Sequence, residues 1–166
     1  MKRKTPSIVV RMAVPNDASS IASVLHESFA EYKRSYTEEA FTATTPTSDQ
    51  IQARMIEGPV WVAFHADAIV GTVSAVAKGE ALYIRSMAVL PSARGRGIAR
   101  LLLKHVEEFA RIHGFERLIL STTPFLTGAI RLYEQSGFRR SSEGPHELYG
   151  TPLFTMAKTL DFHLDI

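Results

Sequence analysis

The chain has 166 residues, 45% of them apolar and 22% charged, which is ordinary for a globular protein able to bury one core. It contains no cysteine, which excludes disulfides, thiolate metal sites and cysteine nucleophiles and makes a cytoplasmic location the expected one. A net charge of +2 and the lack of a long apolar run give no sign of a nucleic-acid or membrane partner, so we expect one domain over residues 1–166.

The first third of the chain is expected to combine one strand with helices. Residues 8–12 predict a short strand, and Asp17 is placed to cap a helix whose apolar residues recur at helical spacing. Residues 32–46 lack a clean period, so we expect a loop that carries a broken second helix. Residues 48–57 predict a short helix that ends at Gly58.

A meander of strands follows. Residues 60–64 and 69–76 are rich in β-branched side chains and predict a hairpin, in which Gly71 marks either a bulge or a close backbone approach. Residues 81–90 predict the next strand, which Pro91 ends.

The second half predicts helices and strands in alternation. An amphipathic helix begins at Ile98 and ends near Gly114, and residues 117–122 form a strand parallel to the one before the helix. Residues 127–136 predict another helix. The final strands are expected at residues 138–140 and 153–159. This order predicts an α/β (α+β) fold with a mixed sheet.

The turn between the strand at 81–90 and the following helix has the features of an anion site. Gly95 and Gly97 let the backbone approach an anion closely, and the first N–H groups of the helix have no intrahelical acceptors. Arg100 stands where a dinucleotide-binding fingerprint needs its third glycine, and no Walker sequence is present. Taken alone, a solvated turn explains the same residues equally well.

Two linked motifs extend this observation. Residues 85–102 resemble the coenzyme A signature of the Gcn5-related N-acetyltransferases (GNAT), whose core Arg/Gln-x-x-Gly-x-Gly/Ala is matched by Arg94, Gly97 and Ala99. Residues 129–138 look like the family's A-x-x-L-Y-x-x-x-G-F segment at the expected distance along the chain. The resemblance implies a three-layer fold with helices on both faces of a mostly antiparallel sheet of about seven strands. It also implies that the sheet is splayed between the strands at 81–90 and 117–122.

The resemblance implies acetyl-CoA as cosubstrate, held by backbone groups and without a metal. The pantetheine arm is expected along the backbone of Met87, Ala88 and Val89, where a free N–H near Val89 would polarise the thioester. The pyrophosphate is expected on the turn and the helix that it opens. The residues assigned to it are Arg94, Gly95, Arg96, Gly97, Ile98, Ala99 and Arg100.

The catalytic assignments come from the same resemblance. Tyr133 matches the family's usual general acid, although a buried tyrosine of the helix core is the alternative interpretation. Leu126 stands where many members have an asparagine that contacts the cofactor, so this contact is either lost or made by Thr122, Thr123 or Thr127 instead.

The general base is the least defined residue of the predicted site. Some members use a glutamate where this chain has Tyr83, so the nearest carboxylate is Glu80, which is otherwise a solvated turn residue. His146 is a second candidate in the loop before the last strand.

The expected function is direct transfer of an acetyl group from acetyl-CoA to an amine of a small molecule or protein. Residues 27–57 and 141–150 are expected to shape the acceptor site, and the family often forms homodimers. Acidic residues of the first segment would favour a cationic acceptor, or simply form a solvated face: Glu27, Glu31, Glu38, Glu39 and Asp49. The alternatives are a non-catalytic coenzyme A-binding sensor and a nucleic-acid binder using Arg94, Arg96, Arg100, Arg139 and Arg140.

Overall fold

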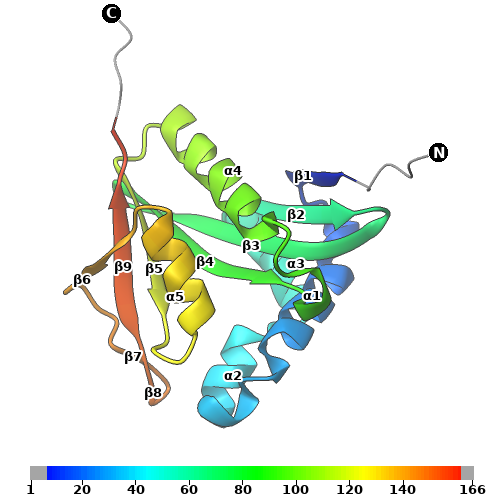
Figure 1. Ribbon diagram of the computed structural model, residues 1–166, viewed down its shortest axis with the longest axis horizontal. Helices are drawn as coiled ribbons and strands as arrows, with labels where there is room; N and C mark the ends of the chain where they lie inside the picture. Colours follow the sequence, from blue (N-terminus) through cyan, green and yellow to red (C-terminus); the bar gives the residue numbers. More distant parts are fainter. Residues whose placement is uncertain (1–6, 162–166) are drawn as a thin grey trace, which may run out of the picture.

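The computed structural model describes residues 7–161 and contains a seven-stranded sheet in the order β1-β2-β3-β4-β5-β9-β6 (Figure 1). The β4–β5 pair is parallel and the other neighbouring strands are antiparallel. The mixed, mostly antiparallel sheet that the sequence predicts is therefore confirmed. The strands of this sheet are β1 (Ile8–Met12), β2 (Val60–His65), β3 (Ala68–Lys78), β4 (Ala81–Val89), β5 (Arg117–Thr122), β6 (Arg139–Ser141) and β9 (Phe154–Thr159).

Five α-helices accompany the sheet within the described residues, and a short β7–β8 pair stands apart from it. In Figure 1, α4 and α5 cross in front of the sheet and α3 lies behind it. The helices and the separate strands are α1 (Ala18–Ala30), α2 (Glu38–Thr44), α3 (Ser48–Glu57), α4 (Ile98–Ile112), α5 (Thr127–Gln135), β7 (Glu147–Leu148) and β8 (Thr151–Pro152).

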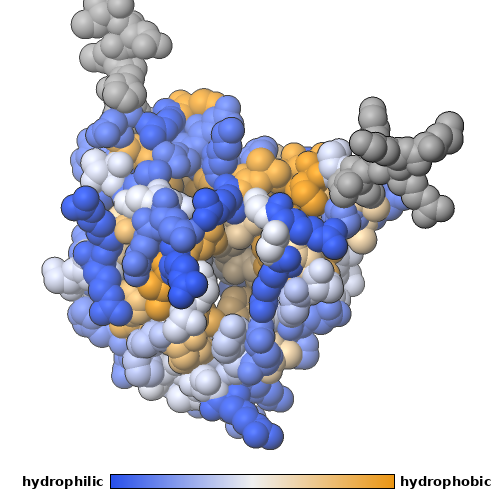
Figure 2. Space-filling model, in the orientation of Figure 1, coloured by the Kyte–Doolittle hydropathy of each residue, from blue (hydrophilic) through white to orange (hydrophobic). Residues whose placement is uncertain are grey.

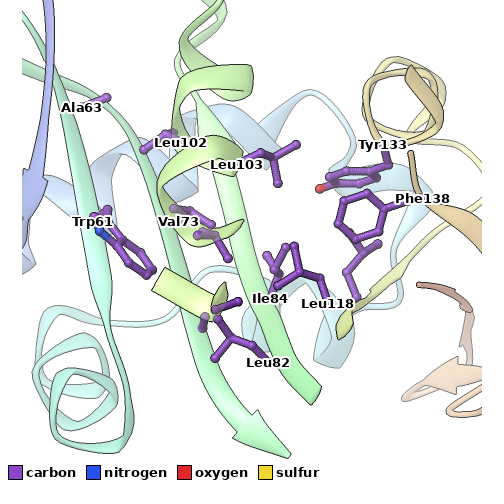
Figure 3. Close-up of a cluster of buried hydrophobic side chains, with 14 of the residues drawn as sticks. Trp61, Ala63, Val73, Leu82, Ile84, Leu102, Leu103, Leu118, Tyr133 and Phe138 are labelled. Carbon is purple, nitrogen blue, oxygen red and sulfur yellow. The ribbon is translucent and has the colours of Figure 1, made fainter. Parts of the chain in front are cut away.

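Each face of the sheet has its own buried cluster, because successive side chains of a strand point to opposite faces. Trp61 and Ala63 of β2 belong to the cluster that also holds Leu102 of α4 and Tyr133 of α5 (Figure 3). Val60 and Val62 of the same strand pack instead with apolar residues of α1 and α3. The sheet is thus the middle of three layers, as the resemblance implies.

The segment at residues 32–46 contains the broken helix that the sequence predicts. A short 3-10 turn at Lys33–Ser35 is followed by α2, whose first turn is capped by Thr37 through the Ala40 N–H. Tyr36 and Phe41 then pack into a third small cluster. This cluster holds α2 against Phe125 in the loop after β5.

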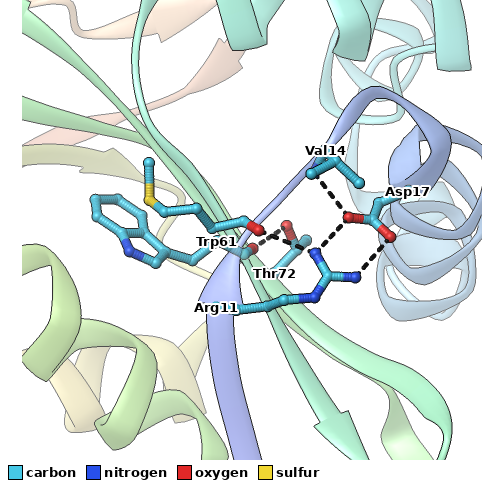
Figure 4. A network of polar contacts seen from close by, with 6 residues as sticks. Arg11, Val14, Asp17, Trp61 and Thr72 are labelled. Atoms are coloured by element: carbon cyan, nitrogen blue, oxygen red, sulfur yellow. Dashed lines mark hydrogen bonds and ion pairs between the residues drawn. The ribbon is translucent and has the colours of Figure 1, made fainter.

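The expectation for Asp17 was wrong in its detail. Its side chain makes no capping bond to α1, but accepts a hydrogen bond from the Val14 N–H at 2.8 Å (Figure 4). It also accepts two from the Arg11 guanidinium, at 2.7 and 3.1 Å. A 3-10 turn at Pro15–Asp17 precedes α1 and directs the carboxylate back toward β1, which the helical pattern of the sequence does not reveal.

The Asp17→Asn variant is expected to unfold more easily than the wild type at neutral pH. The hydrogen bonds from Arg11 lower the pKa of Asp17; burial acts against this shift, and the Val14 N–H adds to it. The charged form of Asp17 therefore stabilises the folded state above about pH 4. That stabilisation is lost as the pH falls through the lowered pKa. We expect a loss of about 1–3 kcal/mol at pH 7 that shrinks toward pH 3.

Urea unfolding at the two pH values measures this difference. Asp67→Asn, in the exposed turn between β2 and β3, is the matched control and should change stability little at either pH. An Asp17 variant as stable as the wild type at pH 7 would contradict the structural role of this carboxylate.

Two irregularities in the sheet position the site. On β4, Ser86 pairs with Ser74 while Ile84 pairs with Ala75, so Arg85 is an extra, bulged residue. The parallel pairing of β4 with β5 covers Ala81–Ile84 and ends with Ile84 opposite Leu120. Beyond that point the two strands diverge, which confirms the predicted splay.

Gly71 fulfils both of its predicted roles. Val70 is the extra residue of a second bulge, because Ala63 pairs with Gly71 and Phe64 pairs with Ile69. A Cβ at Gly71 would lie 3.1 Å from the Ile98 side chain at the start of α4. The missing side chain therefore lets the first turn of α4 pack closely on β3.

Candidate active site

A cavity of about 830 Å³ opens where β4 and β5 diverge. Figure 2 shows the hollow near the centre of the viewed face, with apolar colours in its deeper part. The structure brings most of the predicted site residues to its wall. These are Met87, Ala88, Val89, Arg94, Gly95, Gly97, Ile98, Ala99, Arg100 and Tyr133.

The turn before α4 has the backbone geometry of an anion cradle. Gly95 and Gly97 have φ values of +81° and +76°, and apart from their chain neighbours no atom of residues 7–161 lies within 4 Å of a Cβ placed on either. The first helical bond runs from the Leu101 N–H to the Gly97 carbonyl at 3.1 Å. The N–H groups of residues 98–100 therefore have no acceptor within the helix and are free to bind an anion.

Three arginines surround this turn, and each has a partner. Arg94 pairs with Glu31, at the end of α1, with 2.6 Å between Nη1 and Oε1. Arg100 donates to the Gln135 side chain at the end of α5. Arg96 lies 3.0 Å from a ring nitrogen of His65 and is not part of the cavity wall. Arg94 and Arg100 therefore line the cavity, and Arg94 does so while ion-paired with Glu31.

The β5 wall carries hydroxyl groups suited to a polar ligand. The Oγ of Ser121 and the Oγ1 of Thr123 are buried, and neither has a hydrogen-bond partner among the described residues. Leu126 and Thr122 also line the cavity, whereas Thr127 does not. Orphaned hydroxyls beside the unpaired part of β4 fit the amide groups of a pantetheine arm.

Tyr133 is buried at the inner end of this cavity, with 7% of its surface exposed. Its ring lies 5.7 Å from that of Phe138, and its hydroxyl points from α5 toward the sheet (Figure 3). Burial, followed by the nearby phenol of Tyr36, raises the pKa of Tyr133 well above its usual value. The hydroxyl therefore stays protonated and can act as a proton donor.

Tyr36 brings a second phenol to the same cavity from the α2 side. Burial raises its pKa to about 12, and the Thr123 hydroxyl acts in the opposite direction. The hydroxyl groups of Tyr36 and Thr123 are near each other but not hydrogen-bonded, because Thr123 Oγ1 has no hydrogen-bond partner in residues 7–161. The ring of Tyr36 packs at 4.9 Å from Phe125, which fixes α2 against the loop after β5.

The predicted base candidates are not brought to the cavity. Glu80 lies at the turn before β4, where its carboxyl group raises the pKa of Glu116, and it is not among the lining residues. His146 is exposed and does not line the cavity either, but its neighbour Glu147 does. Within the described residues, Glu147 is the one carboxylate in the wall. No sequence pattern predicts β7, so nothing in the sequence distinguishes Glu147 from an exposed loop residue.

Two further arginines in the cavity wall were not predicted as site residues. Arg54 comes from α3 and Arg85 from the β4 bulge, and residues of α1 and α2 line the same cavity. Of the acidic residues expected to favour a cationic acceptor, none lines the cavity. The segments expected to form the acceptor side, 27–57 and 141–150, do contribute to its wall.

The described residues contain neither a metal-binding cluster nor a membrane-spanning helix. In residues 7–161, no three His, Asp or Glu side chains gather in a way that could hold a metal ion. No helix in the same range is both long enough and apolar enough to span a bilayer.

Comparison with known proteins places this site in a family context. The model of the acetyltransferase (GNAT) family matches residues 22–138. The Escherichia coli (strain K12) protein called "Uncharacterized N-acetyltransferase YjgM" is 33% identical over 138 residues, covering 80% of this chain and 82% of that protein. Rat N-acetylaspartate synthetase is 34% identical over 106 residues, which is 63% of this chain and 36% of that protein. The chain thus matches little more than a third of the synthetase's length.

Solved structures share the fold. The PaiA N-acetyltransferase of Thermoplasma acidophilum, solved with coenzyme A, has a TM-score of 0.81 at 16% identity, covering 93% of this chain and 99% of that one. The YncA acetyltransferase of Salmonella typhimurium, solved with acetyl-CoA, has a TM-score of 0.73 at 21% identity, covering 96% and 98%. From the family match, the E. coli relative and the splayed sheet, we conclude that this chain belongs to the GNAT acetyltransferase family.

Proposed function

We propose that residues 1–166 act as a single, cytoplasmic N-acetyltransferase domain that transfers an acetyl group from acetyl-CoA directly to an amine. One observation carries the proposal. The anion cradle at Gly95–Gly97, the unpaired stretch of β4 and the buried phenol of Tyr133 all line one cavity. The absence of cysteine supports direct transfer, because a thiol carrier of the acetyl group is missing, and agrees with a reducing compartment.

In the proposed reaction the protein mainly positions and polarises the thioester. The pyrophosphate binds the N–H groups that open α4, and the pantetheine arm extends along residues 87–89. The amine nitrogen attacks the thioester carbon, whose oxygen becomes an oxyanion held by a backbone N–H near Val89. The carbon–sulfur bond then breaks, and Tyr133 gives its proton to the departing sulfur.

The remaining requirement is a group that takes the proton from the amine. Glu147 is the carboxylate that reaches the cavity, so we assign this role to it in place of Glu80. An amine with a pKa near 10 is mostly protonated at neutral pH, and a carboxylate nearby can accept that proton directly or through water.

The Glu147→Gln variant is expected to lower kcat/KM about tenfold or more at pH 7. The defect should shrink as the pH rises toward 10, because the free amine then forms without a base. Steady-state rates between pH 6.5 and 9.5 measure this convergence. Glu134→Gln, on the exposed face of α5, is the control for loss of one surface carboxylate. A Glu147→Gln variant with the wild-type rate and pH dependence would contradict the assignment of Glu147 as the general base.

Release of free coenzyme A from acetyl-CoA, measured across a panel of amines, tests the activity itself. An amine-dependent rate of thiol release above the background hydrolysis is the expected result. Coenzyme A binding without thiol release for any amine would favour the sensor alternative. Calorimetric titration with coenzyme A supplies the binding half of that comparison.

A further inference from the structure

A compact group of charges lies on the acceptor side of the cavity. Arg85 Nη1 donates to Glu57 Oε2, which joins the β4 bulge to the end of α3. Arg54, one turn earlier on α3, lowers the pKa of Glu57 through its charge, as Arg85 does through its hydrogen bond. Both arginines line the cavity, whereas Glu57 does not.

The charges of this group do not balance. Two guanidinium groups face one carboxylate, and that carboxylate is about half exposed. The pKa of Arg54 is lowered, first by burial and then by the charge of Arg85, so the two cations oppose each other. Within residues 7–161, the Arg54 side chain has no ion pair of its own. The cavity wall therefore carries one uncompensated positive charge at this point.

The guanidinium group of Arg85 also has two N–H donors without an acceptor in the described residues. Its Nε and Nη2 atoms are buried and have no hydrogen-bond partner in the described part of the chain. Leaving a buried donor unsatisfied destabilises the folded state, and more so when the group is charged. Nε and one terminal nitrogen form the fork that binds a carboxylate in two parallel hydrogen bonds. A carboxylate bound by this fork would satisfy both of these donors.

Arg54 and Arg85 lie where the acceptor, rather than the pyrophosphate, would bind. The predicted pyrophosphate turn leads into α4, which packs on one face of the sheet, whereas Arg54 belongs to α3, which packs with α1 on the other face. Arg85 is adjacent in sequence to the unpaired stretch of β4. A group bound by the two arginines would therefore lie beside the thioester, away from the pyrophosphate.

We propose that the acceptor is an amine that also carries a carboxylate, and that Arg54 and Arg85 bind this carboxylate while the amine faces the thioester. This inference rests on the proposed acetyl transfer and names its substrate class. Glu147 of β7 also lines the cavity, and we expect it to contact the amino end of such a molecule. The opposite signs of these side chains suit a zwitterionic acceptor of the amino acid class.

The first test compares acceptors that differ in the carboxylate alone. Each of a set of L-amino acids is assayed beside its amino acid amide and its decarboxylated amine. We expect kcat/KM to be at least about tenfold higher for the amino acid than for either partner, since one charged hydrogen bond contributes about 1.5–3 kcal/mol. Equal or faster turnover of the amide and the decarboxylated amine would overturn the inference while leaving acetyl transfer intact.

The second test removes the donors. Arg54→Gln, which breaks no ion pair, should raise KM for the preferred amino acid about tenfold or more and remove most of its advantage over the amide. Arg85→Lys keeps the charge and the contact with Glu57 but loses the fork, and should have a similar effect. Arg139→Gln, on the exposed edge strand β6, is the matched control and should change neither value.

Equilibrium binding separates this inference from the proposed function. Titration of the coenzyme A-bound protein with the same amino acids should show binding that Arg54→Gln weakens. Binding of this kind without turnover would contradict acetyl transfer and support the carboxylate site. Turnover with no loss of selectivity in either variant would contradict the carboxylate site, provided that thermal unfolding shows both variants to be folded.

Discussion

Replacing Tyr133 with phenylalanine is expected to lower kcat roughly 10²- to 10⁴-fold, the usual range for loss of a general acid. Phenylalanine keeps the ring that packs against Phe138, so the fold and the affinity for coenzyme A should stay close to wild type. The measurement is steady-state thiol release together with calorimetric coenzyme A affinity. A loss confined to kcat would mark the hydroxyl as catalytic, because a purely structural tyrosine would change stability instead.

Burial raises the pKa of Tyr133, so its neutral form persists to higher pH than that of an exposed tyrosine. The rate of the wild type should therefore show no decrease from loss of this proton below about pH 10. Tyr149→Phe removes an exposed hydroxyl and serves as the control. A Tyr133→Phe enzyme with wild-type kcat, at a rate limited by chemistry, would exclude the assignment.

Replacing Gly97 with alanine is expected to weaken coenzyme A binding roughly 10- to 100-fold. Gly97 caps α4 with φ at +76°, beside the unbonded N–H groups of the first turn. Apart from its chain neighbours, no atom of residues 7–161 lies within 4 Å of the added methyl group, so this group would extend into the space where we expect the pyrophosphate. Loss of one charged hydrogen bond, about 1.5–3 kcal/mol, gives the predicted change in Kd.

The same helix offers a closely matched control for this substitution. Gly114, just after α4, also has φ at +76° and, apart from its chain neighbours, no described atom within 4 Å of a Cβ position, but it lies outside the cavity wall. Both alanine variants should therefore lose about 1–2 kcal/mol of stability from the strained backbone. Weaker coenzyme A binding in Gly97→Ala alone would assign the effect to the site. Equal binding in the two variants would contradict the cradle.

The parts of the fold that the sequence predicts well depend on short stretches of chain. The apolar period of α4, the glycines at its start and the β-rich meander are all local signals, and the structure has these elements where they were expected. The splay of β4 from β5 could not be read from periodicity, because both strands look equally regular. It came from the family resemblance, and the register that ends at Ile84 and Leu120 confirms it.

The parts that were missed depend on contacts between distant segments. Arg85 looks like any polar residue of a strand until the bulge and the end of α3 bring it beside Arg54 and Glu57. Glu147 and Glu80 are equivalent in sequence terms, and the separate β7–β8 pair decides which of them reaches the cavity. Asp17 satisfied the pattern of a helix cap, but a 3-10 turn gave its carboxylate other donors.

The short parallel contact between β4 and β5 has a thermodynamic consequence. Four paired positions join the two parts of the sheet, and the remainder of that seam is open over residues 85–89. If the cosubstrate binds along this seam, as we propose, its binding free energy is added to the free energy that keeps the two parts together. We therefore expect acyl-CoA to raise the melting temperature, and this increase can be measured before any acceptor is known.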